Sequence, residues 1–182
     1  MLFGGANLYS VHNSCSTAGK WGTAMSIELN QKDVAILRLL QQDASLTSTA
    51  IAEKLNLSQS PCWRRINHIE QEGLIRKRVA LLDRTKLGMD VVVFATLNLS
   101  MHDRAHVERF EQEIQKFPEV MECYTMTGAW DYMLKIIVRD VRHYEQFIRE
   151  HLLTMPVIRE MHSHIAVTEI KNTTELPLDT QI

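Results

Sequence analysis

Residues 47–87 constrain the fold more than any other part of the chain, because they hold two short amphipathic stretches separated by a tight Asn-Leu-Ser turn. The second stretch is predicted to be a helix, with Arg64 and Arg65 on or near its free side. Gly73 would end that helix, and a short basic strand is predicted over 76–82. This order is typical of a winged helix-turn-helix, which makes double-stranded DNA the first partner to consider.

Local signals place the starts of three helices in this half of the chain. Asn30 is a good N-cap for the first helix, and Asp33 adds negative charge to its first turn. Thr47 opens the second helix. Ser58 is the expected N-cap of the third, and Pro61 lies in its first turn, where a missing N–H costs nothing.

Composition indicates an ordinary globular protein, with 45% hydrophobic and 23% charged residues in a length of 182. No apolar run approaches the roughly 20 residues that span a bilayer, and the N-terminus lacks the pattern of a secretory signal. The three cysteines are odd in number and far apart, which argues against a disulfide framework or a zinc site. These features predict a cytoplasmic protein with no membrane partner.

Net charge is distributed unevenly along the chain. Residues 27–90 contain ten Lys/Arg and eight Asp/Glu, a balance of +2, whereas residues 91–175 contain nine and thirteen, a balance of −4. The asymmetry indicates two domains with different partners. Because +2 is modest for a DNA-binding domain, dimers or larger assemblies would be needed to sum the phosphate contacts.

The second half has a different hydrophobic period, which predicts strands alternating with helices. Strands are expected at 91–99, 120–127, 132–138 and 158–170, and helices at 103–116 and 141–153. The order β-α-β-β-α-β is the ferredoxin-like split unit, a four-stranded antiparallel sheet with both helices on one face. Its other face must be covered, usually by a partner subunit.

The predicted fold class is therefore α+β, with an N-terminal winged helix-turn-helix and a C-terminal ferredoxin-like domain. The expected divisions are a disordered tail at 1–26, the DNA-binding domain at 27–82, a linker at 83–90, the second domain at 91–175 and a tail at 176–182.

The third helix carries the residues predicted to read DNA. Arginine can pair bidentately with guanine, and Asn or Gln with adenine, so Arg64, Gln59 and Asn67 suit base edges. Trp63 lies on the flank, and His68 on the free side. The remaining candidates suit phosphates, and they are Ser58, Ser60, Arg65, Arg76, Lys77 and Arg78. The alternative is a solvated polar face, which the preceding helix and the basic strand disfavour. Cys62 is interpreted as a small core residue.

Motifs in both halves resemble one family. The runs SQSPCWRRINHIEQEGLI, VALLD and TGAWDYMLKIIV, in this order within residues 27–175, are similar to the Lrp/AsnC (feast/famine) transcription regulators. The resemblance implies a bacterial or archaeal regulator whose C-terminal domain, called RAM, assembles dimers and octamers and binds a free amino acid. The family usually has Asp after the turn glycine, whereas this chain has Ala129 and then Trp130.

The resemblance also implies an effector site. The positions that match are Thr125, Met126, Thr127, Gly128, Trp130, Asp131 and Val141, with His164 and Ala166 from the last strand. Gly128 permits close backbone approach, turn N–H groups can hold a carboxylate, and Asp131 can take an α-ammonium group. The alternatives are that Asp131 caps the turn, that Trp130 is a dimer-interface aromatic, and that Thr125 fills a strand position.

A rival interpretation rests on His162 and His164, which lie two apart on one strand face, a geometry that can bind a metal or haem. The architecture also resembles sirohaem decarboxylases. Two histidines on a partly wet sheet face are the commoner explanation, and an enzyme has no need to keep an arginine-bearing recognition helix. We therefore predict a transcriptional regulator, not an enzyme, with no metal and no cofactor.

Overall fold

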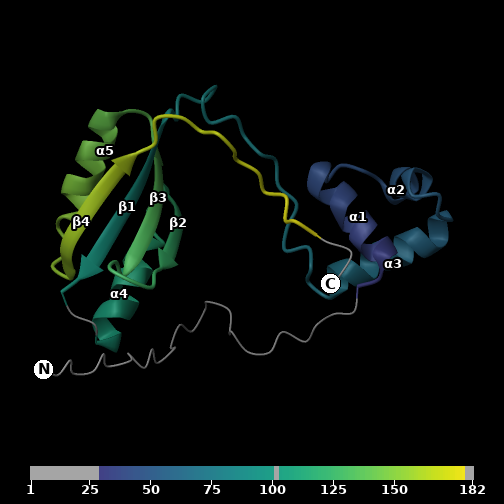
Figure 1. Cartoon of the computed structure of the whole chain (residues 1–182), viewed down its shortest axis with the longest axis horizontal. Coiled ribbons are helices and arrows are strands. Elements are labelled where there is room, and N and C mark those ends of the chain that lie inside the picture. Colours follow the sequence, from purple (N-terminus) through teal and green to yellow (C-terminus); the bar gives the residue numbers. More distant parts are fainter. Residues whose placement is uncertain (1–28, 101–102, 179–182) are drawn as a thin grey trace, which may run out of the picture. The chain divides into compact units, whose positions relative to one another are not determined.

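The computed structural model describes residues 29–100 and 103–178. The chain divides into two units, one made of residues 29–82 with 169–178 and the other of residues 83–168 (Figure 1). The tail predicted over 1–26 lies outside the described residues. The division also differs at the C-terminal side, because 169–175 were expected in the second domain and instead associate with the first unit.

Three helices form the first unit, namely α1 (Gln31–Gln42), α2 (Ser48–Lys54) and α3 (Gln59–Gln71) (Figure 1). Their apolar sides pack into one core, which consists of Ile36, Leu37, Leu40, Ile51, Ala52, Cys62, Ile66 and Ile69. The Cys62 side chain is fully buried there, and this burial raises the pKa of its thiol. Cys62 is thus an inert core residue, as the sequence indicated.

Helix α1 begins with a complete capping box. The Asn30 side chain accepts hydrogen bonds from the backbone N–H groups of Lys32 at 2.9 Å and Asp33 at 3.1 Å. In return, an Asp33 carboxylate oxygen accepts the Asn30 N–H at 3.1 Å. Thr47 caps α2 with its side chain alone, by accepting the Ala50 N–H at 3.2 Å. These contacts confirm the predicted starts of α1 and α2, because each satisfies N–H groups that lack partners within the helix.

Helix α3 ends at a glycine in the left-handed region. Gly73 has φ of +72°, its N–H donates to the Glu70 carbonyl, and the next N–H, of Leu74, reaches back to the Ile69 carbonyl. This pair of bonds is the Schellman motif, which confirms the predicted helix end. At the other end of α3, Ser58 occupies the N-cap position with extended backbone, but its side chain makes no capping bond.

The predicted strand at 76–82 is wrong. Residues 76–82 adopt no strand conformation, and the apolar side chains of Val79, Leu81 and Leu82 are more than half exposed. A strand requires a neighbour to complete its hydrogen bonds, and none pairs with this segment among the residues described. The segment after α3 is held by Arg78, whose guanidinium donates to the Glu70 carboxylate and to the Ala44 carbonyl.

The second unit is an antiparallel sheet in the strand order β2-β3-β1-β4. Its elements in chain order are β1 (Val91–Leu99), α4 (Arg104–Ile114), β2 (Val120–Thr125), β3 (Tyr132–Val138), α5 (Val141–Phe147) with a π-helical turn (Ile148–Leu152), and β4 (Ile158–Ile165). This arrangement confirms the predicted ferredoxin-like split unit.

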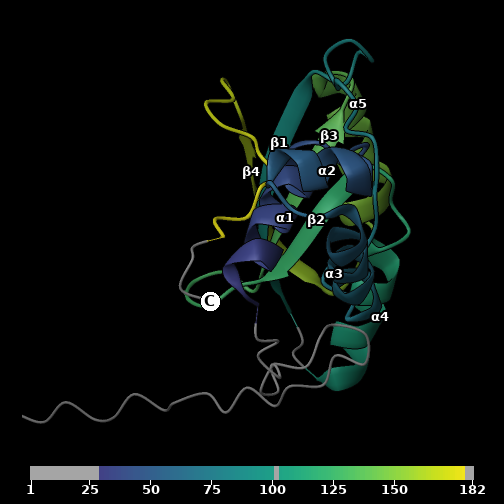
Figure 2. The ribbon, with the colours of Figure 1, turned by 90° about the vertical axis from the view of Figure 1, so that its right-hand side faces the viewer.

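Both helices of this unit cover the same face of the sheet (Figure 2). The strand side chains that point toward them alternate along each strand, as in Val93, Ala95 and Leu97 of β1, which are fully buried. Phe110 of α4 and Phe147 of α5 complete this core. The opposite face of the sheet carries the polar and aromatic groups discussed below.

Strand β4 is shorter than predicted, because it ends at Ile165 and does not continue to residue 170. The last ladder contact is the Ala166 N–H donated to the Val92 carbonyl at 2.9 Å. Since β1 begins at Val91, the apolar residues that follow β4 have no strand to pair with. Val167 and Ile170 are accordingly almost fully exposed.

Candidate nucleic-acid interface and ligand site

Helix α3 presents a polar face opposite its buried side. Arg64 is exposed, and Trp63 beside it keeps 55% of its surface exposed. Within the described parts of the chain, seven of the predicted DNA contacts make no side-chain hydrogen bond or ion pair. They are Ser58, Ser60, Trp63, Arg64, Asn67, Arg76 and Lys77.

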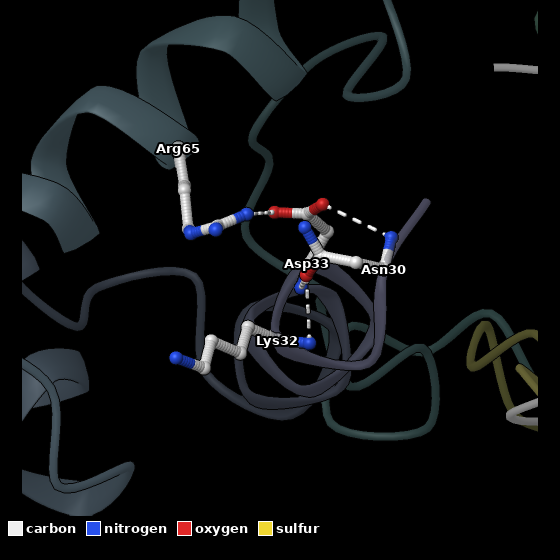
Figure 3. Close-up of polar contacts among 4 residues, drawn as sticks. All are labelled: Asn30, Lys32, Asp33 and Arg65. Carbon is white, nitrogen blue, oxygen red and sulfur yellow. Dashed lines mark hydrogen bonds and ion pairs between the residues drawn. The ribbon is translucent and has the colours of Figure 1, made fainter. Parts of the chain in front are cut away.

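Arg65 behaves differently from its neighbour Arg64. Its Nη1 donates to an Asp33 carboxylate oxygen at 2.9 Å, and the Asp33 side chain is only 10% exposed (Figure 3). The same carboxylate closes the capping box with Asn30. Arg65 therefore ties α3 to the first turn of α1. A guanidinium has five N–H donors, so this pairing leaves donors that can reach a phosphate.

Three other predicted DNA contacts also have partners within the domain. The Gln59 amide nitrogen donates to Thr49 Oγ1 at 2.8 Å, which links α3 to α2. His68 Nδ1 lies 3.8 Å from a carboxylate oxygen of Glu72. Arg78 is held by Glu70 at 2.8 Å, as described above. No local sequence pattern indicated the contacts of Gln59 and Arg65, which join residues 10 and 32 positions apart.

In the second unit, the turn between β2 and β3 is closed by its own backbone. The Met126 N–H donates to the Asp131 carbonyl at 2.8 Å, which brings both ends of the turn together. Between them, Gly128 has φ of +113°, a conformation that side-chain-bearing residues rarely adopt. Thr127 and the rest of the turn are exposed, and only Trp130 and Asp131 are half-buried.

Asp131 anchors this turn to the end of β1. Its Oδ2 accepts the Leu99 N–H at 2.8 Å, and its own N–H donates to Asn98 Oδ1 at 3.0 Å. The Asn98 amide in turn donates to the Ala129 carbonyl at 3.1 Å. Asn98 is buried, and it was not singled out from the sequence. The available signal was an amide in a strand that is otherwise apolar apart from Thr96.

The face of the sheet opposite the two helices carries an aromatic pair beside this turn. The rings of Trp130 and His162 lie 4.7 Å apart, and His162 Nε2 is 3.1 Å from a Glu160 carboxylate oxygen. Thr96 lies between Met133 and His162 in the strand register. Its hydroxyl is buried and makes no hydrogen bond within the described structure.

The nine predicted effector residues do not form one cluster within a chain. The residues of the 125–131 group lie at the start of β3, where Tyr132 pairs with Leu97 of β1. Val141 lies beyond the other end of β3, which is at Val138. Six residues of strand separate the two ends, a span of about 20 Å. Ala166 lies at the Val141 end, and His164 lies between the ends, opposite Phe94.

Residues 29–100 and 103–178 contain no group of three or more His, Cys, Asp or Glu side chains that could hold a metal ion. Within the same residues, no helix is both long and apolar enough to cross a membrane.

The fold defines a class of protein, a helix-turn-helix unit joined to a ferredoxin-like domain. Family models agree, because residues 29–76 match a winged helix-turn-helix DNA-binding domain and residues 92–176 match the Lrp/AsnC ligand-binding domain. The chain is 40% identical over 155 residues to the transcriptional regulator AzlB of Bacillus subtilis, and the aligned region covers 85% of this chain and 99% of that protein. It is 34% identical to the DNA-binding transcriptional activator DecR of Escherichia coli, with 83% and 99% covered.

Solved structures show the same likeness. An AsnC family transcriptional regulator from Agrobacterium tumefaciens is similar with a TM-score of 0.81 and 41% identity, over 85% of this chain and all of that one. The regulator NMB0573 of Neisseria meningitidis, solved as a complex with L-Met, has a TM-score of 0.81 and 31% identity over the same shares. The chain belongs to the Lrp/AsnC family of transcriptional regulators.

Proposed function

We propose that this regulator reads its operator with the outer face of α3 and that Arg64 is its main base contact. The observation that supports this assignment is the contrast between two adjacent arginines. Arg65 is held against α1 by Asp33, whereas Arg64 is exposed and makes no side-chain hydrogen bond or ion pair with another described residue. A domain that fixes one arginine and leaves its neighbour outward offers a guanidinium that can enter the major groove.

The working unit is a cytoplasmic homodimer that assembles into octamers. In a dimer, two copies of α3 would enter successive major grooves, with half-sites one or more helical turns apart. Assembly suits the modest charge balance of +2 in residues 27–90, because each additional subunit adds phosphate contacts. In this proposal the protein acts by binding and not by catalysis.

The first experiment measures DNA affinity for Arg64→Ala. A specific site is selected with the wild-type protein from random DNA, and Lys32→Ala is the matched control, because it removes an exposed cation from α1 of the same domain. Losing one bidentate base contact should weaken specific binding roughly 5- to 150-fold and spare the control. If Arg64→Ala weakens specific and nonspecific binding equally, Arg64 is a phosphate contact and the assignment fails.

The effector in this proposal is a free amino acid held at the turn between β2 and β3. Backbone N–H groups of the turn would take its carboxylate, and Asp131 its ammonium group. The Neisseria meningitidis relative, solved with L-Met, supports this class of ligand. Because Val141 and Ala166 lie at the far end of the sheet, a site using all nine residues would draw them from a second copy. The ligand changes promoter binding only if it binds one assembly more tightly than another.

A thermal-shift screen against the twenty amino acids tests the effector. Ligand at about 100 times its dissociation constant adds ~2.7 kcal/mol to stability, so a selective rise identifies the amino acid. Addition of a haem-type tetrapyrrole tests the rival enzyme. A flat amino-acid screen together with a Soret band from the tetrapyrrole would replace the effector proposal with a sirohaem-decarboxylase-like activity, in which His162 and His164 are the first candidates for ligands.

A further inference from the structure

The C-terminal segment 176–178 contacts the outer surface of α1. The Gln41 side-chain amide pairs with both backbone groups of Leu176, since its nitrogen donates to the Leu176 carbonyl at 3.3 Å and its oxygen accepts the Leu176 N–H at 2.7 Å. One turn away, Arg38 donates from Nε to the Leu178 carbonyl at 3.0 Å and also from Nη2. Two side chains of α1 thus form hydrogen bonds with the main chain of residues 176–178, which are at least 135 positions away in sequence.

The local sequence shapes the segment for this contact. The Leu178 N–H donates to the Leu176 carbonyl at 2.9 Å, which closes a three-residue turn around Pro177. Proline favours such a turn because its ring holds φ near −65°. Just before it, Thr173 Oγ1 accepts the Glu175 N–H at 3.1 Å. The turn directs the Leu178 side chain into contact with the core of the helical unit, whereas Leu176 remains 67% exposed.

We propose that the Arg38–Gln41 surface of α1 is a docking site for residues 176–178 of the same chain. Two independent features support it. The hydrogen bonds recognise main-chain groups of the turn, and the Leu178 side chain is an apolar anchor that packs against the core of helices α1, α2 and α3. Each hydrogen bond to a docked segment contributes modestly, so the combination of four with an apolar anchor is what holds it.

The docking site gives the ligand-binding domain a second connection to the DNA-binding domain, and this one is non-covalent where it meets α1. The first is the segment 83–90 after α3, and the second is the segment that follows β4 and ends on α1. Helix α1 also carries Asp33, which holds Arg65 of α3. Loosening the segment should therefore loosen α1 and, through Asp33, the recognition helix. This relay rests on the proposed DNA-reading role of α3, whereas the docking itself does not.

Two variants remove the contact from opposite sides. Gln41→Ala deletes both hydrogen bonds to Leu176, and Leu178→Ala deletes the apolar anchor. Leu176→Ala is the matched control, because its side chain is exposed and its contacts use only backbone atoms. All three are made in the full chain, so that an unfolded fragment cannot mimic the effect.

The measurement is hydrogen–deuterium exchange by mass spectrometry, together with affinity for the selected DNA site. Gln41→Ala and Leu178→Ala should each speed exchange of the α1 amides roughly fivefold or more, with the strands β1–β4 and the Leu176→Ala control unchanged. Unchanged exchange of α1 in both variants would overturn the docking site. Protection that disappears on dilution would also overturn it, because the segment would then come from another copy.

DNA affinity decides the relay separately. If both variants weaken specific DNA binding along with the α1 exchange, the connection to α3 is supported. Faster α1 exchange with unchanged affinity would overturn the relay and leave the docking site. A wild-type protein that selects no DNA at all would instead refute the proposed function, while the exchange data still decide the docking.

Discussion

Replacing Asp33 with alanine should destabilise the DNA-binding unit through two separable contacts. One Asp33 oxygen accepts the Asn30 N–H in the capping box at 3.1 Å, and the other accepts Arg65 Nη1 at 2.9 Å (Figure 3). The Asp33 side chain is 10% exposed and the Arg65 side chain 34% exposed, so the ion pair is neither fully buried nor a surface pair. Both contacts disappear in Asp33→Ala, and Arg65 is left without its partner.

The magnitude follows from these two parts. Loss of the capping contact costs about 1 kcal/mol. The ion pair contributes about 1–2 kcal/mol, between the values for exposed and buried pairs, because Arg65 keeps a third of its surface in water. The total is roughly 2–3 kcal/mol, and each 1 kcal/mol should lower the melting temperature of a unit this small by about 4–8 °C.

A double-mutant cycle of Asp33→Ala and Arg65→Ala isolates the ion pair. Unfolding of the full chain in urea is followed by circular dichroism and by hydrogen exchange of α1 and α3. The expected coupling is about 1–2 kcal/mol, whereas the capping loss persists in the Arg65→Ala background. Lys32→Ala, at the adjacent exposed position, is the control. Coupling within about 0.3 kcal/mol of zero would refute the reasoning, since the two side chains would then act independently.

Three further predictions concern the ligand-binding domain. Gly128→Ala should lower its stability in urea by about 1–3 kcal/mol because φ is +113°, and no change would mean that the turn adopts another conformation. The hydrogen bond from Lys135 lowers the pKa of the Glu122 carboxyl in the folded protein. The contact therefore stabilises the fold at pH values above the pKa of Glu122 in the unfolded chain, and this stabilisation is lost as the pH falls through the lower pKa of the folded state. In Lys135→Met, the free energy of unfolding should therefore decrease less steeply as the pH is lowered below about 4.5. Asp131→Asn keeps an acceptor for the Leu99 N–H but removes the charge, and should abolish the amino-acid thermal shift without affecting DNA binding; an intact titration would exclude Asp131 as a ligand.

Elements whose signals lie within a few residues could be predicted from the sequence. Asn30 with Asp33, and Thr47 with Ala50, meet across three positions, so the capping residue specifies where each helix begins. Gly73 specifies where α3 ends, because the left-handed backbone there suits glycine. The change of hydrophobic period after residue 90 likewise indicated strands alternating with helices. Together these local signals were sufficient for the order of elements and hence for the fold class.

The limits of the strands depended on neighbours far away in sequence. Residues 76–82 and 166–170 have apolar character that predicts strand, yet neither has a partner among the residues described. Strand β4 ends opposite the start of β1, where the Ala166 N–H donates to the Val92 carbonyl. The sequence of residues 166–170 does not indicate where β1 starts. Pairing is a property of two segments, so the sequence of one cannot define its length.

The candidate sites show the same distinction. The sequence by itself determined which residue types are present, including a pair of arginines on α3 and a glycine turn before Asp131. Only the tertiary structure decided that Arg65 is held by Asp33, 32 positions earlier, and that Arg64 is not. The contact of Leu176 with Gln41 spans 135 positions and joins segments without any shared periodicity. Local hydrogen bonding specifies helices and turns, whereas the partners of exposed polar side chains depend on which surfaces the folded core brings together.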